Sequence, residues 1–173
     1  MLRILIVEDE PLLAQTLKHL IELNPRYEVT EVADDLASAL QAAEERRPDI
    51  ALVDLQLARG STGFSVAVKL NEAGVPCLFT TGKAPSFPMP DLALGCLMKP
   101  YTEEDIVRAL KTAEDLLRGR ERLRPSRPPN LQIYAEDAAP GPCLEHNFLA
   151  APEVQALERP SLKSRLSEWW SAH

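Results

Sequence analysis

Five polar side chains stand at the ends of four short apolar runs, and their types suit phosphoryl transfer. Glu8 and Asp9 follow one run, Asp54 ends another, and Thr81 and Lys99 follow two more. If each run is a buried parallel strand, its carboxyl end opens onto one crevice of the sheet. Carboxylates hold a hard divalent cation, while a hydroxyl and an ammonium bind phosphate oxygens. The arrangement predicts a magnesium-assisted phosphoryl-transfer site.

The elements that would carry these groups alternate between strand and helix from residue 2 to residue 118. Short apolar runs predict strands at residues 2–7, 27–32, 50–54, 75–80 and 96–98. Apolar stripes and capping residues predict helices at residues 11–23, 35–47, 64–72 and 103–118. This alternation predicts an α/β domain: a doubly wound five-stranded parallel sheet with helices on both faces.

The segment at residues 83–90, between the fourth and fifth predicted strands, is poorly suited to a helix. It contains Pro85, Pro88 and Pro90. Proline lacks the backbone donor that a helix needs, and it restricts the residue before it. We therefore expect no more than about one helical turn here, near residues 91–94.

The net charge and the cysteines limit which classes of protein this sequence can belong to. Residues 1–118 hold 12 Lys and Arg against 19 Asp and Glu, so the formal net charge of −7 falls on this part of the chain. An acidic domain is poorly suited to bind DNA by itself. Cys77 and Cys96 fall within predicted strands, and with Cys143 they indicate reduced thiols. No run approaches the roughly 20 apolar residues that span a bilayer. We expect a cytoplasmic protein without membrane contact.

Residues 1–118 resemble the receiver domain of two-component response regulators. Four motifs stand in the order of that family: Val7-Glu8-Asp9-Glu10, Leu52-Val53-Asp54-Leu55, Thr81-Gly82 and Lys99-Pro100-Tyr101. The resemblance implies the flavodoxin-like fold of CheY-like receivers. It also implies a phosphoacceptor signalling protein and not an enzyme in the usual sense. Such a protein takes a phosphoryl group from a histidine kinase or a histidine phosphotransfer protein.

The resemblance also implies a set of magnesium ligands. Asp9 and Asp54 would bind Mg²⁺ directly, Glu8 would act mainly through water, and the backbone carbonyl of Gln56 would complete the protein's share. An acid just before a helix also suits the positive end of the helix dipole. For Glu8, which precedes the helix expected from Pro11, this second interpretation stays open.

Three groups are implied to meet the phosphoryl group itself. Asp54 would be the nucleophile and form an acyl phosphate. Lys99 would pair with one phosphoryl oxygen, and Thr81 would donate its hydroxyl to another. The peptide bond before Pro100 is expected to be cis, which would direct Lys99 into the crevice.

Some features depart from the usual receiver pattern. The loop at residues 55–63 lacks the usual proline and reaches its glycine, Gly63, one residue late. Cys96 stands three residues before Lys99, where most receivers have a Tyr or Phe whose rotation reports phosphorylation. Phe79-Thr80-Thr81-Gly82 is similar to the Phe-Ala-Thr-Gly stretch of an atypical receiver subgroup.

Residues 119–173 differ in character from the domain before them. They hold seven of the fifteen prolines and show no alternation of elements. Their pattern predicts an Arg- and Pro-rich linker at 119–130, a short strand at 131–134, and an amphipathic helix at 161–170 with Leu162, Leu166, Trp169 and Trp170 on one face. An extension this short does not fit a helix-turn-helix output domain.

Two functions follow from these expectations. In the first, the receiver acts through protein–protein contacts and not through DNA, and homodimer formation is left open. In the second, the receiver fold is a constitutive binding or scaffold module whose extension carries the interaction. Phosphorylation of Asp54 distinguishes the two.

Overall fold

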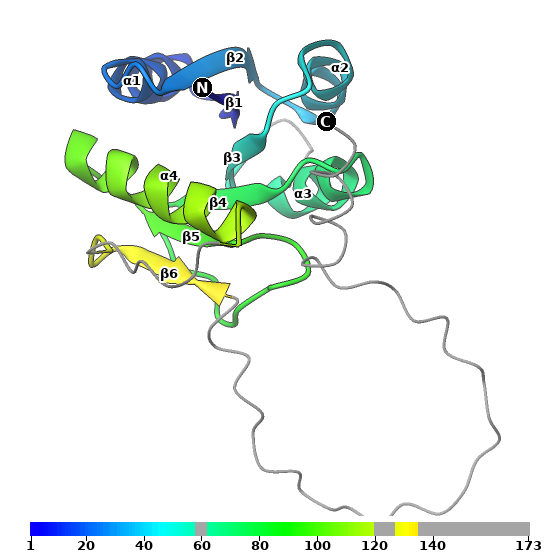
Figure 1. Cartoon of the computed structure of the whole chain (residues 1–173). Coiled ribbons are helices and arrows are strands. Elements are labelled where there is room, and N and C mark those ends of the chain that lie inside the picture. The colour runs from blue at the N-terminus through cyan, green and yellow to red at the C-terminus, as the bar shows by residue number, and fades with distance from the viewer. Residues whose placement is uncertain (58–61, 120–126, 135–173) are drawn as a thin grey trace, which may run out of the picture.

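The computed structural model describes residues 1–57, 62–119 and 127–134, which form one sheet flanked by helices (Figure 1). The strand order is β2–β1–β3–β4–β5–β6. The strands are β1 (Leu2–Val7), β2 (Tyr27–Ala33), β3 (Ile50–Asp54), β4 (Cys77–Thr81), β5 (Gly95–Met98) and β6 (Leu131–Ile133). The first five are parallel, and β6 runs antiparallel to β5. The helix predicted at 161–170, and Cys143, lie outside the described residues.

Helices cover both faces of the sheet. In the described residues they are α1 (Pro11–Glu22), α2 (Leu36–Arg46), α3 (Gly63–Glu72) and α4 (Glu103–Leu117). Helices α1 and α4 pack on one face, and α2 and α3 pack on the other (Figure 1). Asp35, Thr62 and Thr102 each form a capping box at a helix start. Such caps contribute about 1 kcal/mol each, so local sequence determines where these helices begin.

Alternation along the central strands divides the core into two layers. On β1, Ile4 and Ile6 face the layer with α1 and α4, whereas Leu5 and Val7 face the layer with α2 and α3. All four side chains are at most 1 % exposed. A strand that is apolar on both faces needs helices over both faces. β1 must therefore lie in the middle of the sheet. Its carboxyl end lies beside the carboxyl end of β3.

The predicted α/β fold, with a parallel sheet and flanking helices, is confirmed, but the sheet has one strand more than the five predicted. The additional strand is β6, in which Leu131 and Ile133 are buried and Gln132 is exposed. The sequence indicated a short strand there but gave it no partner, because a distant pairing leaves no local signal. The predicted division at residue 118 assigns β6 to the extension, whereas in the structure it is hydrogen-bonded to the sheet.

The connection between β4 and β5 contains no helix in the structure. Its only regular feature is a turn in which Leu92 and Ala93 donate their N–H groups to the carbonyl of Met89. The side-chain amide of Asn71, on α3, donates to the carbonyl of Leu92 at 2.6 Å and so attaches this connection to the helix. The three prolines therefore have the effect expected from the sequence. None of the described helices is long and apolar enough to cross a membrane.

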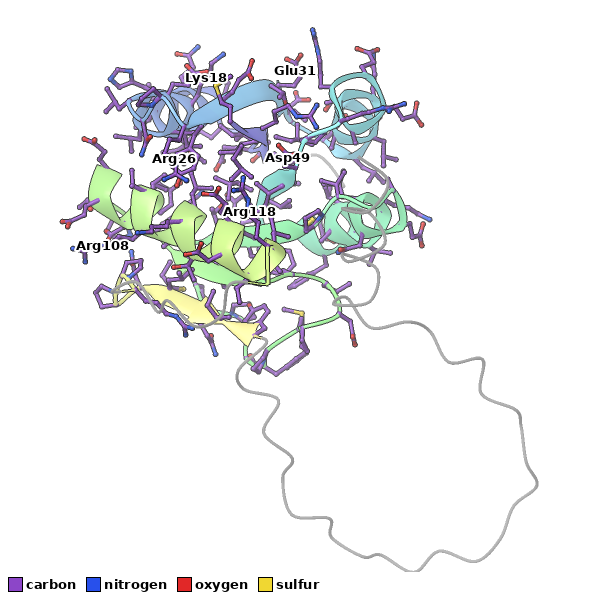
Figure 2. The ribbon with its side chains drawn as sticks, viewed as in Figure 1. Lys18, Arg26, Glu31, Asp49, Arg108 and Arg118 are labelled. Atoms are coloured by element: carbon purple, nitrogen blue, oxygen red, sulfur yellow. The ribbon has the colours of Figure 1, made fainter. Side chains whose placement is uncertain are left out.

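A buried carboxylate on α4 pairs with two exposed arginines at the end of the sheet remote from the predicted crevice. The carboxylate of Glu114 is 5 % exposed and pairs with Arg26 at 3.3 Å and Arg118 at 2.9 Å. Both arginines are labelled in Figure 2. A buried carboxylate is tolerated only when charges of opposite sign compensate it. These contacts attach the last turns of α4 to the residue that precedes β2.

The close approach of β6 to β5 depends on the glycine at position 95. A Cβ placed on Gly95 would lie 2.2 Å from the carbonyl oxygen of Gln132, a backbone atom that cannot move aside alone. We expect Gly95→Ala to lower the free energy of unfolding by about 1–3 kcal/mol, the usual cost of overpacking. Urea denaturation measures this change. Gly82→Ala is the control, since nothing lies within 4 Å of a Cβ there. Equal midpoints for the two variants would contradict the prediction.

Candidate active site

Parallel register brings the predicted site residues to one edge of the sheet. Val7 pairs with Val53, Asp54 with Thr80, and Thr81 with Met98. The residues that follow these pairs therefore emerge side by side. Glu8, Asp54 and Lys99 meet there although they are separated by tens of residues in sequence.

The ammonium group of Lys99 is shared by two carboxylates. Its Nζ donates to Oε2 of Glu8 and to Oδ2 of Asp54, at 2.8 Å in each case. Glu8 is 3 % exposed and Asp54 is 5 % exposed, whereas the Lys99 side chain keeps 19 % of its surface. The lysine is therefore the most exposed of the three side chains. One positive charge compensates two buried negative ones.

The pKa values of Glu8 and Lys99 reflect this sharing. Burial raises the pKa of Glu8, and the charge of Asp54 adds to the effect, whereas Lys99 opposes it. Burial alone would lower the pKa of Lys99, but its hydrogen bonds to Asp54 and Glu8 outweigh burial and raise it. Lys99 is therefore cationic at neutral pH. The acids around it remain in excess, and an additional cation would be bound favourably.

The carboxylate of Asp54 is oriented by its own loop. Its Oδ1 accepts the backbone N–H of Gln56 at 3.0 Å, so its two oxygens have different partners. The start of α3 packs directly behind it: a Cβ on Gly63 would lie 2.2 Å from the carbonyl oxygen of Asp54. The glycine that the sequence places one residue late is thus required by close packing against the strand end.

Thr81 and Asp9 also belong to strand ends at this edge of the sheet. The hydroxyl of Thr81 donates to the carbonyl of Lys83 at 3.1 Å and accepts the N–H of Lys83 at 3.3 Å. Thr81 is 1 % exposed. Asp9 follows Glu8 at the strand end and is half-buried. The Lys99–Pro100 peptide bond is cis, as expected.

The donors at this edge suit a hard cation. Within the described residues, no three His, Cys, Asp or Glu side chains form a group that would hold a metal by themselves. Mg²⁺ does not need such a cage, because it keeps several waters and takes one or two carboxylates. Glu8, Asp9 and Asp54 supply three carboxylates against the single ammonium of Lys99. Magnesium therefore fits both the oxygen donors and the excess negative charge.

Sequence reasoning missed the contacts that β6 and the residues next to it make with β5 and the segment around Lys99. Asn130 contacts the carbonyls of Met98 and Pro100, which flank Lys99. Tyr134 is 1 % exposed and packs in the same core layer as Cys96. The only local signal was the alternation of buried and polar residues at 131–133, which does not identify a partner strand.

Comparisons with known proteins agree with this architecture. The family model described as the response regulator receiver domain matches residues 4–111. The sensory transduction protein LytT of Bacillus cereus is 35 % identical over 117 residues, covering 64 % of this chain and 46 % of that protein. The DNA-binding response regulator MtrA of Mycolicibacterium smegmatis is 36 % identical over 123 residues, covering 70 % and 50 %. The chain thus spans about half the length of the curated relatives that it matches.

A solved structure with the same fold is a CheY-like response regulator receiver domain protein from Methanospirillum hungatei. It is 25 % identical, superposes with a TM-score of 0.61, and covers 69 % of this chain and 98 % of its own. The matched share of the present chain therefore corresponds to a nearly complete receiver domain.

Proposed function

The chain belongs to the response regulator receiver family, and on that premise we propose that Asp54 accepts a phosphoryl group from a histidine kinase or a histidine phosphotransfer protein. The observation that carries the proposal is the ammonium of Lys99, 2.8 Å from the Asp54 carboxylate and from Glu8. An ammonium group beside Asp54 would stabilise the negative charge of a phosphoryl group arriving there. A receiver implies a cognate histidine kinase as a partner.

The chemistry assigned to Asp54 is nucleophilic. A carboxylate oxygen attacks the phosphorus of a phosphohistidine, the P–O bond forms, and the P–N bond breaks. The electron pair of the broken bond remains on the imidazole nitrogen, which leaves with a proton from solvent. Lys99 then exchanges its contact with the Asp54 carboxylate for one with a phosphoryl oxygen. Positioned positive charge of this kind supplies most of the catalysis in phosphoryl transfer.

Receiver domains typically bind Mg²⁺, and the proposed ligands here are Asp9, Asp54, Glu8 through water, and the backbone carbonyl of Gln56. When bound, the ion would neutralise charge on the transferring oxygens. The protein's own part is to hold these oxygens at the ends of β1 and β3, where two adjacent parallel strands keep them together.

The response to phosphorylation is assigned to Thr81. Its hydroxyl is bonded to the backbone of Lys83 in the described state. Donation to a phosphoryl oxygen would replace that contact, because one hydroxyl has a single proton to donate. The helix-free connection to β5 begins at this point, so a new Thr81 contact would shift it.

We assign the output to protein–protein contacts. The negative charge of residues 1–118 supports this assignment, because an acidic surface repels the phosphates of DNA. A constitutive scaffold module is the alternative. That alternative predicts a protein whose partner affinity does not change with phosphoryl donors.

The test is uptake of a phosphoryl group from acetyl phosphate by the 173-residue chain, followed by intact-mass measurement. We expect one phosphoryl group per chain, only with Mg²⁺ present, and its loss on treatment with hydroxylamine, which cleaves acyl phosphates. Chelation by EDTA should stop the reaction. A chain that stays unmodified at saturating Mg²⁺ and donor would support the scaffold alternative.

A further inference from the structure

We propose that Asn130 is a positioning residue for Lys99, acting through the backbone on both sides of it. The inference rests on the proposed function, in which Lys99 must meet a phosphoryl oxygen. The segment that carries it, residues 128–134, is called the latch here, and it runs along the outer edge of β5 as β6 and the turn before it (Figure 1).

Asn130 binds the peptide groups that flank Lys99. Its side-chain Nδ2 donates to the carbonyl of Met98 at 3.0 Å and to the carbonyl of Pro100 at 3.4 Å. Its backbone carbonyl accepts the N–H of Met98 at 2.9 Å. Carbonyl oxygens only accept hydrogen bonds, so the orientation of the amide is determined by its partners.

The same stretch of backbone is held from the opposite side by β4. The N–H of Lys99 donates to the carbonyl of Thr81 at 2.8 Å. Lys99 is thus fixed between β4 and the latch, and its side chain reaches from there to Glu8 and Asp54. A shift of its backbone would be transmitted to the ammonium, because that backbone sets where the side chain starts.

The latch is anchored in the core and does not lie loosely on the surface. Leu131 and Ile133 belong to one core layer, and Tyr134 belongs to the other. The N–H of Tyr134 donates to the carbonyl of Leu94 at 3.0 Å. The bare backbone of Gly95 lets the latch approach closely. The contacts of Asn130 are therefore part of a packed edge.

An asparagine at position 130 would be energetically unfavourable if its side chain only covered the outer edge of β5. Its Oδ1 is buried and has no hydrogen-bond partner among the described residues. A buried acceptor without a partner costs about 1–3 kcal/mol. An apolar side chain would avoid this cost. The amide is better explained by what its nitrogen holds, which is the backbone around Lys99.

The expected consequence is a change in rate without a change in metal binding. A displacement of about 1 Å in a positioned catalytic group can cost on the order of 100-fold in rate. We therefore expect Asn130→Ala to slow phosphoryl uptake about tenfold or more. The affinity for Mg²⁺ should stay within about twofold, because the proposed ligands follow β1 and β3. The latch pairs with neither strand.

The experiment compares three variants of the 173-residue chain with acetyl phosphate at saturating Mg²⁺. Asn130→Ala removes the side chain, and Asn130→Asp keeps its shape but removes both donors. Asn24→Ala is the matched control: Asn24 also bonds to backbone, accepting the N–H of Arg26, but it precedes β2 at the far end of the sheet. Uptake rate, Mg²⁺ affinity and amide hydrogen exchange at Lys99 are measured for each.

Slow uptake in both Asn130 variants, with Mg²⁺ affinity kept and faster exchange at Lys99, supports the proposal. Uptake by the Asn130 variants equal to that of wild type and Asn24→Ala overturns it, and so do parallel losses of uptake rate and Mg²⁺ affinity. If the wild type takes up no phosphoryl group, the proposed function fails. The role of Asn130 in positioning Lys99 is then decided by amide hydrogen exchange alone. Unchanged protection of the Lys99 amide in Asn130→Ala then rejects it.

Discussion

Asp54→Asn is expected to abolish phosphoryl uptake from acetyl phosphate while the domain stays folded. The amide has nearly the shape of the carboxylate but is not a competent nucleophile. The fold should tolerate the change, because Lys99 keeps its contact with Glu8 at 2.8 Å. Loss of one of two neighbouring negative charges also lowers the pKa of Glu8, since Asp54 is one of the groups that raise it. Intact mass and a urea titration measure the two effects.

The control for that variant is Asp91→Asn, which removes an exposed carboxylate from the connection between β4 and β5. It should take up the phosphoryl group as wild type does. If Asp54→Asn still gains a phosphoryl group at the wild-type rate, another residue is the acceptor and the assignment of Asp54 is wrong. Peptide mapping would then identify that residue.

Much of the site was predictable because each polar group follows a strand with a clear local signal. Alternate residues of β1 are buried on opposite faces, so the strand reads as one apolar run that ends at Glu8. Asp54 and Lys99 end similar runs. Parallel strands place their carboxyl ends together, and the family resemblance supplied the fold. The meeting of Lys99 with Glu8 and Asp54 follows from these facts.

The sequence indicated a short strand at 131–134, but its pairing with β5 was not predictable, for the opposite reason. β6 has only three residues, and its partner β5 lies more than thirty positions earlier in the sequence. No period or cap in so short a segment identifies its partner. The contacts of Asn130 with the carbonyls of Met98 and Pro100 depend on that pairing. Only the structure reveals these contacts, because every residue has a backbone carbonyl and the sequence does not show which carbonyl accepts a given hydrogen bond.

One departure from the family pattern acquires a physical context in the structure. Cys96 replaces the usual aromatic residue of β5 and is fully buried. Burial raises the pKa of its thiol to about 11, although Tyr134 opposes the shift, so the thiol is neutral. The ring of Tyr134 lies in the same core layer and comes from the end of the latch. An aromatic side chain is thus present beside β5, but it is supplied by a different segment.

Lys99→Met is expected to lower the rate of phosphoryl uptake at least about 100-fold, the usual effect of removing one positioned charge from a transition state. Methionine keeps the length of the side chain but has no ammonium. Two buried carboxylates, Glu8 and Asp54, are then left without their shared cation. Breaking a buried pair from one side costs about 3–5 kcal/mol, and the 19 % exposure of Lys99 places this site toward the lower end.

The direction in which the stability of Lys99→Met changes with pH distinguishes an electrostatic loss of stability from a packing defect. Burial already raises the pKa of Glu8 in the folded protein, and removal of Lys99 raises it further. A carboxyl group whose pKa is raised in the folded state lowers the stability of the protein as the pH rises above the pKa that the group has in the unfolded chain. The deficit of Lys99→Met should therefore be largest near neutral pH and shrink toward about pH 5. Added Mg²⁺ should also reduce it, because the cation compensates the same carboxylates.

Lys69→Met provides the matched control, since Lys69 is 51 % exposed and pairs with Glu72 on α3 at 2.7 Å. Exposed pairs contribute about 0–1 kcal/mol, so its stability should change little with pH or Mg²⁺. A deficit in Lys99→Met that is the same at both pH values and with or without Mg²⁺ would mean that the lysine acts only by packing. A deficit that Mg²⁺ relieves would mean that Lys99 and the metal compensate one shared excess of negative charge, which is the electrostatic condition that phosphoryl transfer to Asp54 requires.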